Sequence, residues 1–273
     1  MSIITLTTDY GLKDHYVGAL KGKILSQMQE SVIVDITHNV DPFNISEASF
    51  LISNAYSSFP KGTVHLIGVD IELKENNQHI VVHWNDHYFI TADNGILSLL
   101  ITKIKPQKMV AITIHDRLLP ESTDMDVLVT VAIHIAKGGS LNVIGKEIKN
   151  LKEIKELQPV VALDSIKGYV VYIDHFGNAI TNISRSLFLE IAKGRPYEVM
   201  FKNKKVKSIF AKYSDIETIE KQSLSAILGK NLAIFNEAGY LEIGIYKSNP
   251  KIGSASSLLG LEYRDFVMIN FNK

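Results

Sequence analysis

The feature that most constrains the fold is the alternation of strand-like and helix-like segments over the first 70 residues. Residues 2–7, 32–36 and 63–69 are short apolar runs of the kind found in buried strands. Residues 14–28 and 45–56, which lie between them, carry apolar side chains at helical spacing. Because a strand joined to the next by a helix lies parallel to it, this order predicts an α/β domain with a largely parallel sheet.

Two further signals extend this domain. Residues 79–90 alternate apolar and polar side chains around Asn85-Asp86, which predicts a hairpin. Residues 126–137 predict a helix that Gly138 ends, because glycine adopts the left-handed conformation at the C′ position.

The pattern changes in the second half of the chain. Residues 146–158 are charged with spaced Ile and Leu, end at Pro159, and are interpreted as a connector. Later segments such as GYVVYIDHFGNAITNI alternate strand-favouring residues with Gly and Asn. We therefore predict an α/β domain at residues 1–158 and a smaller, mostly antiparallel β domain at residues 159–273.

Composition excludes several classes of protein. The 29 Lys and Arg balance 29 Asp and Glu, and the densest basic run, 202–207, is typical of a solvated strand face, so no nucleic-acid partner is expected. The chain has no cysteine, which excludes disulfides, thiolate metal ligands and a cysteine nucleophile. No apolar stretch approaches the length of a membrane span, and the first residues lack a signal-peptide pattern. We expect a cytoplasmic protein with no membrane partner.

Polar side chains follow the predicted strands, at the edge where open α/β sheets bind ligands. Asp9 ends the first strand, and Asp14 begins the following helix as a candidate N-cap. Two acceptors around a glycine-containing turn suit ribose hydroxyls or a cation. Asp70 ends the third strand and is a candidate general base.

The segment DITHNVDPF, residues 35–43, allows two interpretations at two positions. Asp35 and His38 are either metal ligands or, as we favour, part of a network that holds the loop. Phe43 is either a core side chain or a surface on which a base stacks.

Two other clusters of polar and aromatic residues suggest binding sites. His79, His83 and His87 have the spacing of a helical zinc site, but the surrounding residues predict strand and turn, so we expect no metal. Asp174, Phe176 and Asn178 lie together in a turn of the second domain, where acid, aromatic and amide groups suit an amino-acid head group and a base edge.

Taken in order, these segments resemble the S-adenosyl-L-methionine (SAM) hydroxide adenosyltransferase family, which is related to the fluorinases and chlorinases. The resemblance rests on eight segments: TTDYGLKDHYVGALKG, DITHNVDPF, FPKGTVHLIGVD, TADNGILS, DVLVTVAIHIAKGGSL, IDHFGNAITNI, FAKYSDI and AGYLEIGI. It implies an N-terminal α/β domain, a C-terminal β domain, and a homotrimer whose ligand lies between neighbouring subunits.

The resemblance also implies roles for individual residues, with SAM as the substrate and no metal or other cofactor. Asp9 would hold the ribose hydroxyls with support from Asp14, and Phe43 would lie near the adenosine. Asp174 would meet the methionine ammonium group. Phe176 and Asn178 would flank and hydrogen-bond the adenine region. Asp70 matches the family's catalytic aspartate.

The sequence departs from the family at positions that matter for catalysis. After its aspartate the family reads Pro-Gly-Val-Gly-Thr and then an arginine, whereas this chain has Ile71 to Glu75 and carries Asn77 at the arginine position. The family's Phe-His-Gly-Arg segment, with its catalytic histidine, is replaced by residues 122–125, around Thr123. In the last domain, Glu237 replaces a serine.

Three functions therefore remain open. The first is a hydrolase in which water or hydroxide attacks the ribose C5′ of SAM and releases adenosine and methionine. The second is a protein that binds SAM or adenosine with negligible turnover. The third is transfer of the adenosyl group to another nucleophile.

Overall fold

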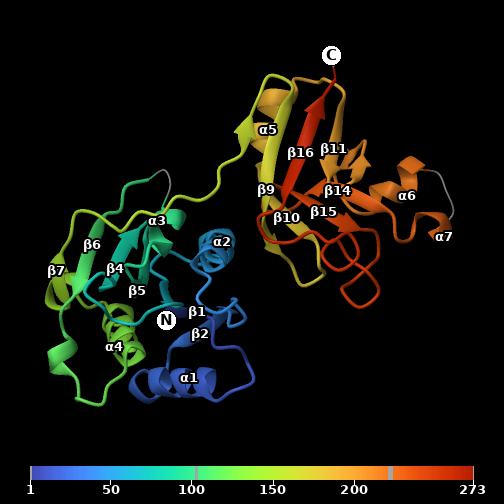
Figure 1. Cartoon of the computed structure of the whole chain (residues 1–273). Helices are drawn as coiled ribbons and strands as arrows, with labels where there is room; N and C mark the ends of the chain where they lie inside the picture. The colour runs from blue at the N-terminus through green and yellow to red at the C-terminus, as the bar shows by residue number, and fades with distance from the viewer. Residues whose placement is uncertain (1, 102–103, 221–223, 273) are drawn as a thin grey trace. The chain divides into compact units, whose positions relative to one another are not determined.

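The computed structural model describes residues 2–101, 104–220 and 224–272 of the chain, which divides into two units. The first is Met1–Glu156 and the second is Leu157–Lys273 (Figure 1). None of the described helices is long and apolar enough to cross a membrane.

The first unit alternates strands and helices as its periodicity predicts. Its elements are β1 (Ile3–Thr8), α1 (Tyr16–Gln27), β2 (Val32–Thr37), α2 (Ile45–Ala55), η1 (Tyr56–Ser58), β3 (Val64–Gly68), β4 (His79–Trp84), β5 (His87–Ala92), α3 (Ile96–Leu100), β6 (Lys108–Ile112), η2 (His115–Arg117), α4 (Asp124–Ala136), η3 (Leu141–Val143) and β7 (Gly145–Glu147).

The sheet of this unit is mixed, so the prediction of a largely parallel sheet is only partly right. Its order among the described residues is β2-β1-β3-β5-β4-β6-β7. The pairs β1/β2, β1/β3 and β3/β5 are parallel, whereas β5/β4, β4/β6 and β6/β7 are antiparallel. One cause is the β4–β5 hairpin, which places β4 antiparallel between β5 and β6, although β6 keeps the direction of β5. The other is β7, which runs antiparallel to β6.

The hairpin itself is confirmed. Asn85 and Asp86 both have positive φ, 51° and 63°, which is the conformation that a two-residue type I′ turn requires. The register pairs His79 with Ala92 and Trp84 with His87 across the turn.

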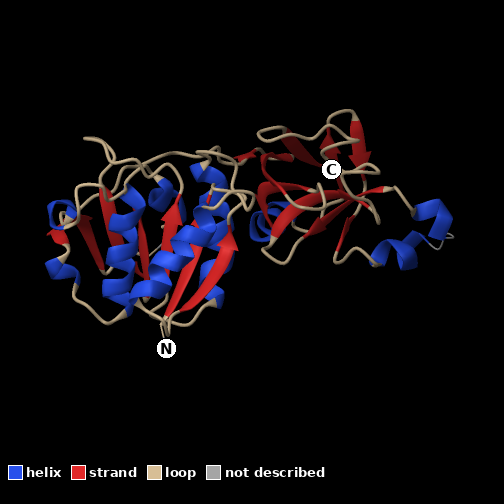
Figure 2. Ribbon diagram, turned by 90° about the horizontal axis from the view of Figure 1, so that it is seen from below, coloured by secondary structure: helices blue, strands red, loops and turns tan. Residues whose placement is uncertain are grey.

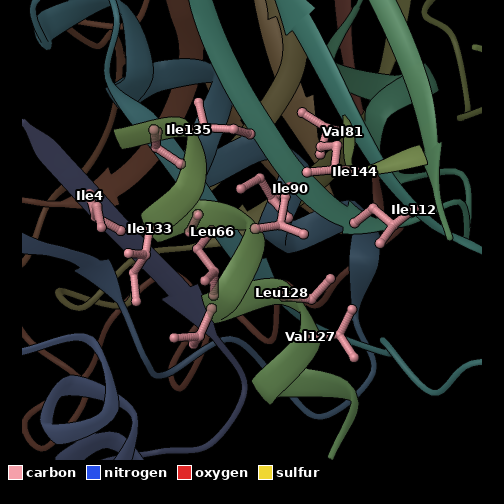
Figure 3. Packing of buried hydrophobic residues seen from close by; sticks show 14 of the residues in the cluster. Ile4, Leu66, Val81, Ile90, Ile112, Val127, Leu128, Ile133, Ile135 and Ile144 are labelled. Carbon is pink, nitrogen blue, oxygen red and sulfur yellow. The ribbon is translucent and has the colours of Figure 1, made fainter. Parts of the chain in front are cut away.

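Helices cover both faces of the sheet, as Figures 1 and 2 show. On one face, α1 and α4 pack against the strands through a cluster that includes Ile4, Leu66, Ile90 and Leu128 (Figure 3). On the other face, α2 and α3 contribute to a second cluster. Alternate residues of the central strands enter opposite clusters, as a sheet buried on both sides requires.

Helix α4 begins two residues earlier than predicted. Thr123 accepts from the backbone N–H of Asp126, and Asp126 accepts from the backbone of Thr123, which completes a capping box. The predicted stop is confirmed, because Gly138 follows Lys137 with φ of 81°.

The first part of the segment expected to connect the domains belongs to the first unit. Residues 146–147 belong to β7, which pairs with β6, so they are part of the sheet. Farther along, Ile148 and Leu151 pack against the core cluster that contains α2 and α3. The spaced apolar residues of the segment therefore cover the first unit.

The second unit is built on a nine-stranded sheet among its described residues. Its elements are β8 (Val160–Val161), β9 (Ser165–Ile173), β10 (Ala179–Ser184), α5 (Arg185–Ala192), β11 (Tyr197–Phe201), β12 (Lys204–Val206), β13 (Ile209–Phe210), α6 (Asp215–Glu220), α7 (Leu224–Ile227), β14 (Asn231–Phe235), β15 (Tyr240–Ile245) and β16 (Phe266–Phe271). Its described pairings are antiparallel except β13/β14, in agreement with the prediction. The basic run 202–207 is solvated, with Lys205 paired to Glu198.

Candidate functional site

The carboxyl ends of β1 and β3 bring two predicted carboxylates to one edge of the first unit. These strands are parallel neighbours, with Thr8 beside Gly68. Asp9 is the first residue after β1, and Asp70 is the second after β3. The sheet thus places both residues where open α/β folds bind ligands.

Asp9 and Phe43 are joined directly. The backbone N–H of Phe43 donates to Oδ2 of Asp9 over 2.9 Å. Phe43 has a φ of 63°, and its side chain is 73% exposed. A core role for Phe43 is therefore excluded, and its ring is open to a ligand or a partner surface.

His38 belongs to a buried network, which confirms the favoured interpretation of the loop after β2. Its Nδ1 lies 2.7 Å from the hydroxyl oxygen of Thr8, and its Nε2 lies 3.1 Å from Asp35. Lys21 of α1 completes the chain with a 2.6 Å ion pair to Asp35, and together with His38 it lowers the pKa of that carboxyl, against the opposing effect of burial. Since Thr8 precedes Asp9, this network fixes the backbone from which the Asp9 carboxylate projects.

Asp70 occupies a strained backbone conformation in which two asparagines hold its carbonyl. Its φ is 48°, in the left-handed region that costs an ordinary residue about 1–2 kcal/mol. The side-chain amide of Asn94 donates to the carbonyls of Val69 and Asp70, over 3.0 and 3.1 Å. Asn77 donates to the carbonyls of Asp70 and Glu72, over 3.2 and 2.8 Å.

Asn77 thus has a defined role at the position where the family resemblance expects an arginine. It is buried, and its amide nitrogen is committed to the Asp70 turn. Its amide oxygen is buried without a hydrogen-bond partner among the described residues. This side chain shapes the loop but brings no positive charge to it.

Asp14 does not cap α1, so that prediction is wrong. The helix begins at Tyr16, and its N-cap is His15, whose φ of −76° and ψ of −10° are already helical. Packing sets this start, because Val17 and Leu20 are buried against the sheet. The Asp14 side chain is exposed and has no hydrogen-bond partner among the residues that the structure describes. Its carboxylate is therefore available to a ligand.

A cavity of about 490 Å³ adjoins the Asp70 turn. It is lined by residues from the loop after β1, from α1, from the loop after β3 and from the start of α4, among them Tyr10, Tyr16, Lys23, Ile71 and Asp124. Asp9 and Asp70 do not line it, but their neighbours Tyr10 and Ile71 do. Burial, together with the nearby Asp9, Asp124 and Asp126 carboxylates, raises the pKa of Tyr10 to about 12, so its hydroxyl stays protonated at neutral pH.

The three spaced histidines have separate partners. His79 lies 2.8 Å from the carbonyl of Ile71, His83 stacks on Tyr88 at 4.4 Å, and His87 lies 3.1 Å from a nitrogen of His65. Within the described residues, no group of three or more His, Cys, Asp or Glu is placed to hold a metal ion.

The predicted residues of the second unit meet in the turn between β9 and β10. Asp174 accepts from the backbone N–H of Asn178 over 2.8 Å and from its side-chain amide over 3.0 Å. Gly177 has a φ of 77°, and a Cβ there would lie 2.3 Å from the hydroxyl of Ser254. Phe176, at the turn, is 62% exposed. Acid and amide thus form one unit, with the aromatic ring free beside it.

Sequence reasoning missed two residues near this turn, the partly buried Tyr213 and the buried Glu242. The hydroxyl of Tyr213 donates to the Glu242 carboxylate. Burial raises the pKa of Glu242, and the nearby Asp174 carboxylate adds to this effect, while the hydrogen bond from Tyr213 opposes it. The only sequence signal was their position in two of the segments that carry the family resemblance.

Both units match known domain patterns. Residues 4–145 match the SAM hydroxide adenosyltransferase N-terminal domain, and residues 168–268 match the corresponding C-terminal domain.

Individual proteins also resemble the chain along most of its length. The (R)-S-adenosyl-L-methionine hydrolase of Methanocaldococcus jannaschii is 30% identical, over 98% of this chain and 96% of its own. The fluorinase of Actinopolyspora mzabensis is 23% identical, over 67% of this chain and 72% of its own. A crystal structure of an uncharacterized conserved protein from Thermotoga maritima is 29% identical, has a TM-score of 0.84, and is covered over 98% of this chain and 99% of that one.

Proposed function

Because this chain belongs to the SAM hydroxide adenosyltransferase family, we propose that it hydrolyses S-adenosyl-L-methionine to adenosine and L-methionine. The relative from Methanocaldococcus jannaschii, which carries the name of that hydrolase, supports this assignment over nearly the full chain. The structural observation that carries the proposal is the pair of carboxylates, Asp9 and Asp70, at adjacent strand ends of one sheet edge.

The proposed reaction is an in-line displacement at the ribose C5′. The oxygen of water forms a bond to C5′ while the bond from C5′ to sulfur breaks, and the sulfur keeps the electron pair. Methionine leaves as a neutral thioether, and the proton of the water passes to the Asp70 carboxylate and then to solvent. Because a sulfonium cation is neutralised as the hydroxide attacks, removal of bulk water favours the transition state. The leaving group needs no electrophile, so we propose no metal or cofactor.

Each predicted binding residue has a task in this proposal. Asp9 holds the ribose hydroxyls, and the exposed carboxylate of Asp14 supports that contact. The open ring of Phe43 lies near the adenosine. Asp174 pairs with the methionine ammonium, while Phe176 and Asn178 serve the adenine region. The exposure of both phenylalanine rings supports roles in contact with a ligand or with another subunit.

We further propose a cytoplasmic homotrimer that acts on a small molecule, without a nucleic-acid or membrane partner. The balanced charge of the chain supports the first exclusion. The homotrimer is the assembly that the family resemblance implies.

A second candidate is a SAM- or adenosine-binding protein with negligible turnover. Asn77 favours it, because the amide that replaces the arginine is committed to backbone carbonyls and carries no charge. General acid–base assistance is worth about 10²–10⁴-fold, so loss of the family's arginine and histidine would leave a slow enzyme.

Incubation of the purified protein with SAM, followed by chromatography of adenosine and methionine, tests the proposal. Wild type and Asp164→Asn, an exposed control in the second unit, should form both products at equal rates. Asp70→Asn should lower kcat by about 10²–10⁴-fold, since the amide cannot accept the proton.

Three other outcomes would contradict parts of the proposal. Equal rates in Asp70→Asn and wild type would remove the base role from Asp70. Binding without any product would establish the second candidate. Consumption of SAM with an adenosyl product other than adenosine would indicate transfer to a different nucleophile.

A further inference from the structure

The loop that carries Asp70 is held by side chains at every residue from Val69 to Leu73. Asn94 and Asn77 bind the carbonyls of residues 69, 70 and 72, as described above. The remaining two contacts come from His79, which binds the carbonyl of Ile71, and from Asp124, which accepts from the N–H of Leu73 over 3.1 Å.

The protonation of His79 follows from its partners. A carbonyl only accepts, so Nε2 of His79 carries the proton that it donates to Ile71 over 2.8 Å. Its Nδ1 then accepts from Nε2 of His115, 3.1 Å away in η2. Burial lowers the pKa of His79, and His115 lowers it further, while Ile71 and Asp124 oppose the shift. The imidazole is therefore neutral at pH 7, with both nitrogens used.

Asp124 contacts both the loop and His79. It is the first residue of α4, where the positive end of the helix dipole favours a carboxylate. One of its oxygens binds the N–H of Leu73, and the other lies 3.7 Å from Nε2 of His79. His79 of β4 and Asp124 at the start of α4 thus both bind the residues that follow Asp70, and His115 of η2 binds His79 from behind.

We propose that His79, oriented by His115, is a positioning residue for the hydrolysis, and that it works with Asp124 to hold Asp70 in its left-handed turn. A strained backbone persists only where several surrounding contacts hold it in place. Here His79 and Asp124 add to the contacts that Asn77 and Asn94 make. In this chain they take over the task of fixing the loop, which lacks the family's Pro-Gly-Val-Gly sequence and its arginine. The inference rests on the proposed function, because the atom being positioned is the proposed base.

The test compares His79→Leu, His79→Gln and His83→Leu with wild type. Leucine fills the buried site but donates nothing to Ile71, whereas the glutamine amide reproduces the Nε2 donor. His83, on the same strand, stacks on Tyr88 away from the loop and is the matched control. We expect His79→Leu to lower kcat by about 10–100-fold, with KM for SAM changed less than about twofold, and His79→Gln to recover most of the loss.

Amide hydrogen exchange of residues 70–77 gives a readout that does not depend on turnover. Exchange should accelerate in His79→Leu but not in His79→Gln or His83→Leu. If wild type hydrolyses SAM and His79→Leu keeps its kcat, the positioning role is overturned while the proposed function stands. If wild type forms no adenosine, the proposed function fails, and unchanged exchange in His79→Leu would also overturn the loop-holding role. Faster exchange in that case would support it.

Discussion

The backbone N–H of Phe43 donates to the carboxylate of Asp9 over 2.9 Å, which ties the loop after β2 to the end of β1. Loss of the Asp9 side chain should therefore have two effects, one on the ligand and one on the exposed ring of Phe43. Asparagine separates them, because its amide oxygen still accepts from Phe43 but it carries no charge.

The first prediction concerns adenosine binding. Adenosine and SAM should each raise the thermal midpoint of wild type, since a ligand at 100 times its Kd stabilises the folded state by about 2.7 kcal/mol. Asp9→Ala should abolish this shift and Asp9→Asn should reduce it, as measured by differential scanning fluorimetry. A full shift in Asp9→Ala would remove Asp9 from the binding site.

The second prediction separates the two parts of the ligand. If Asp174 meets the ammonium group, Asp174→Asn should weaken binding of SAM by about 10–100-fold more than binding of adenosine, the worth of a charged hydrogen bond, because adenosine loses only what the disturbed contact with Asn178 costs. Calorimetric titration in an Asp70→Asn background avoids turnover, with Asp164→Asn as the charge control. Equal weakening for both ligands would assign Asp174 to the nucleoside instead.

Much of the first unit was predictable because its signals are local. The apolar runs that form β1, β2 and β3 and the helical spacing of α2 are visible in short windows of sequence. The insertion of β4 between β5 and β6 was not visible, because strand neighbours are chosen by long-range packing. The cap at Asp14 failed for a related reason: burial of Val17 and Leu20 outweighed a local preference.

In the candidate site, too, local contacts were predictable from the sequence and long-range contacts were not. Asp174 and Asn178 lie four residues apart, and the sequence already suggested that they act together. The contact of His79 with His115 joins residues 36 positions apart, so no spacing rule finds it. The same holds for Tyr213 and Glu242, which are 29 positions apart.

The third prediction concerns assembly. A closed trimer, which the family resemblance implies, should sediment with three times the 30.5 kDa of one chain. A partner subunit or a ligand would then cover the exposed rings of Phe43 and Phe176. Analytical ultracentrifugation with and without adenosine measures the mass of the assembly. A monomer that binds adenosine tightly would contradict a site shared between subunits.

The last prediction follows from His65, a buried residue of β3. Its Nδ1 lies 2.7 Å from the hydroxyl of Thr5, its Nε2 lies 3.1 Å from His87, and its ring stacks on Phe89 at 4.8 Å. Burial, with a smaller contribution from His87, lowers its pKa from 6.5 to about 3. The folded imidazole thus stays neutral in a pH range where the unfolded one is protonated.

The sign of the pH effect follows from this difference. As pH falls below about 6.5, the unfolded chain binds a proton at His65 that the folded chain does not, so the free energy of unfolding decreases until pH reaches about 3. Between pH 7 and pH 5 this group alone should cost about 2 kcal/mol. His65→Gln should remove that share of the pH dependence, whereas His175→Gln, an exposed control in the second unit, should not.

Trp84 makes this measurement specific to the first unit. It is the single tryptophan of the chain, and its ring lies 5.8 Å from Phe89 and 5.2 Å from Tyr56, which in turn contacts His65. Urea titrations followed by its fluorescence at pH 7 and pH 5 therefore report on the region that His65 stabilises. The same loss of stability in His65→Gln and wild type would mean that the folded protein protonates His65 near pH 6. Burial would then not lower the pKa of His65.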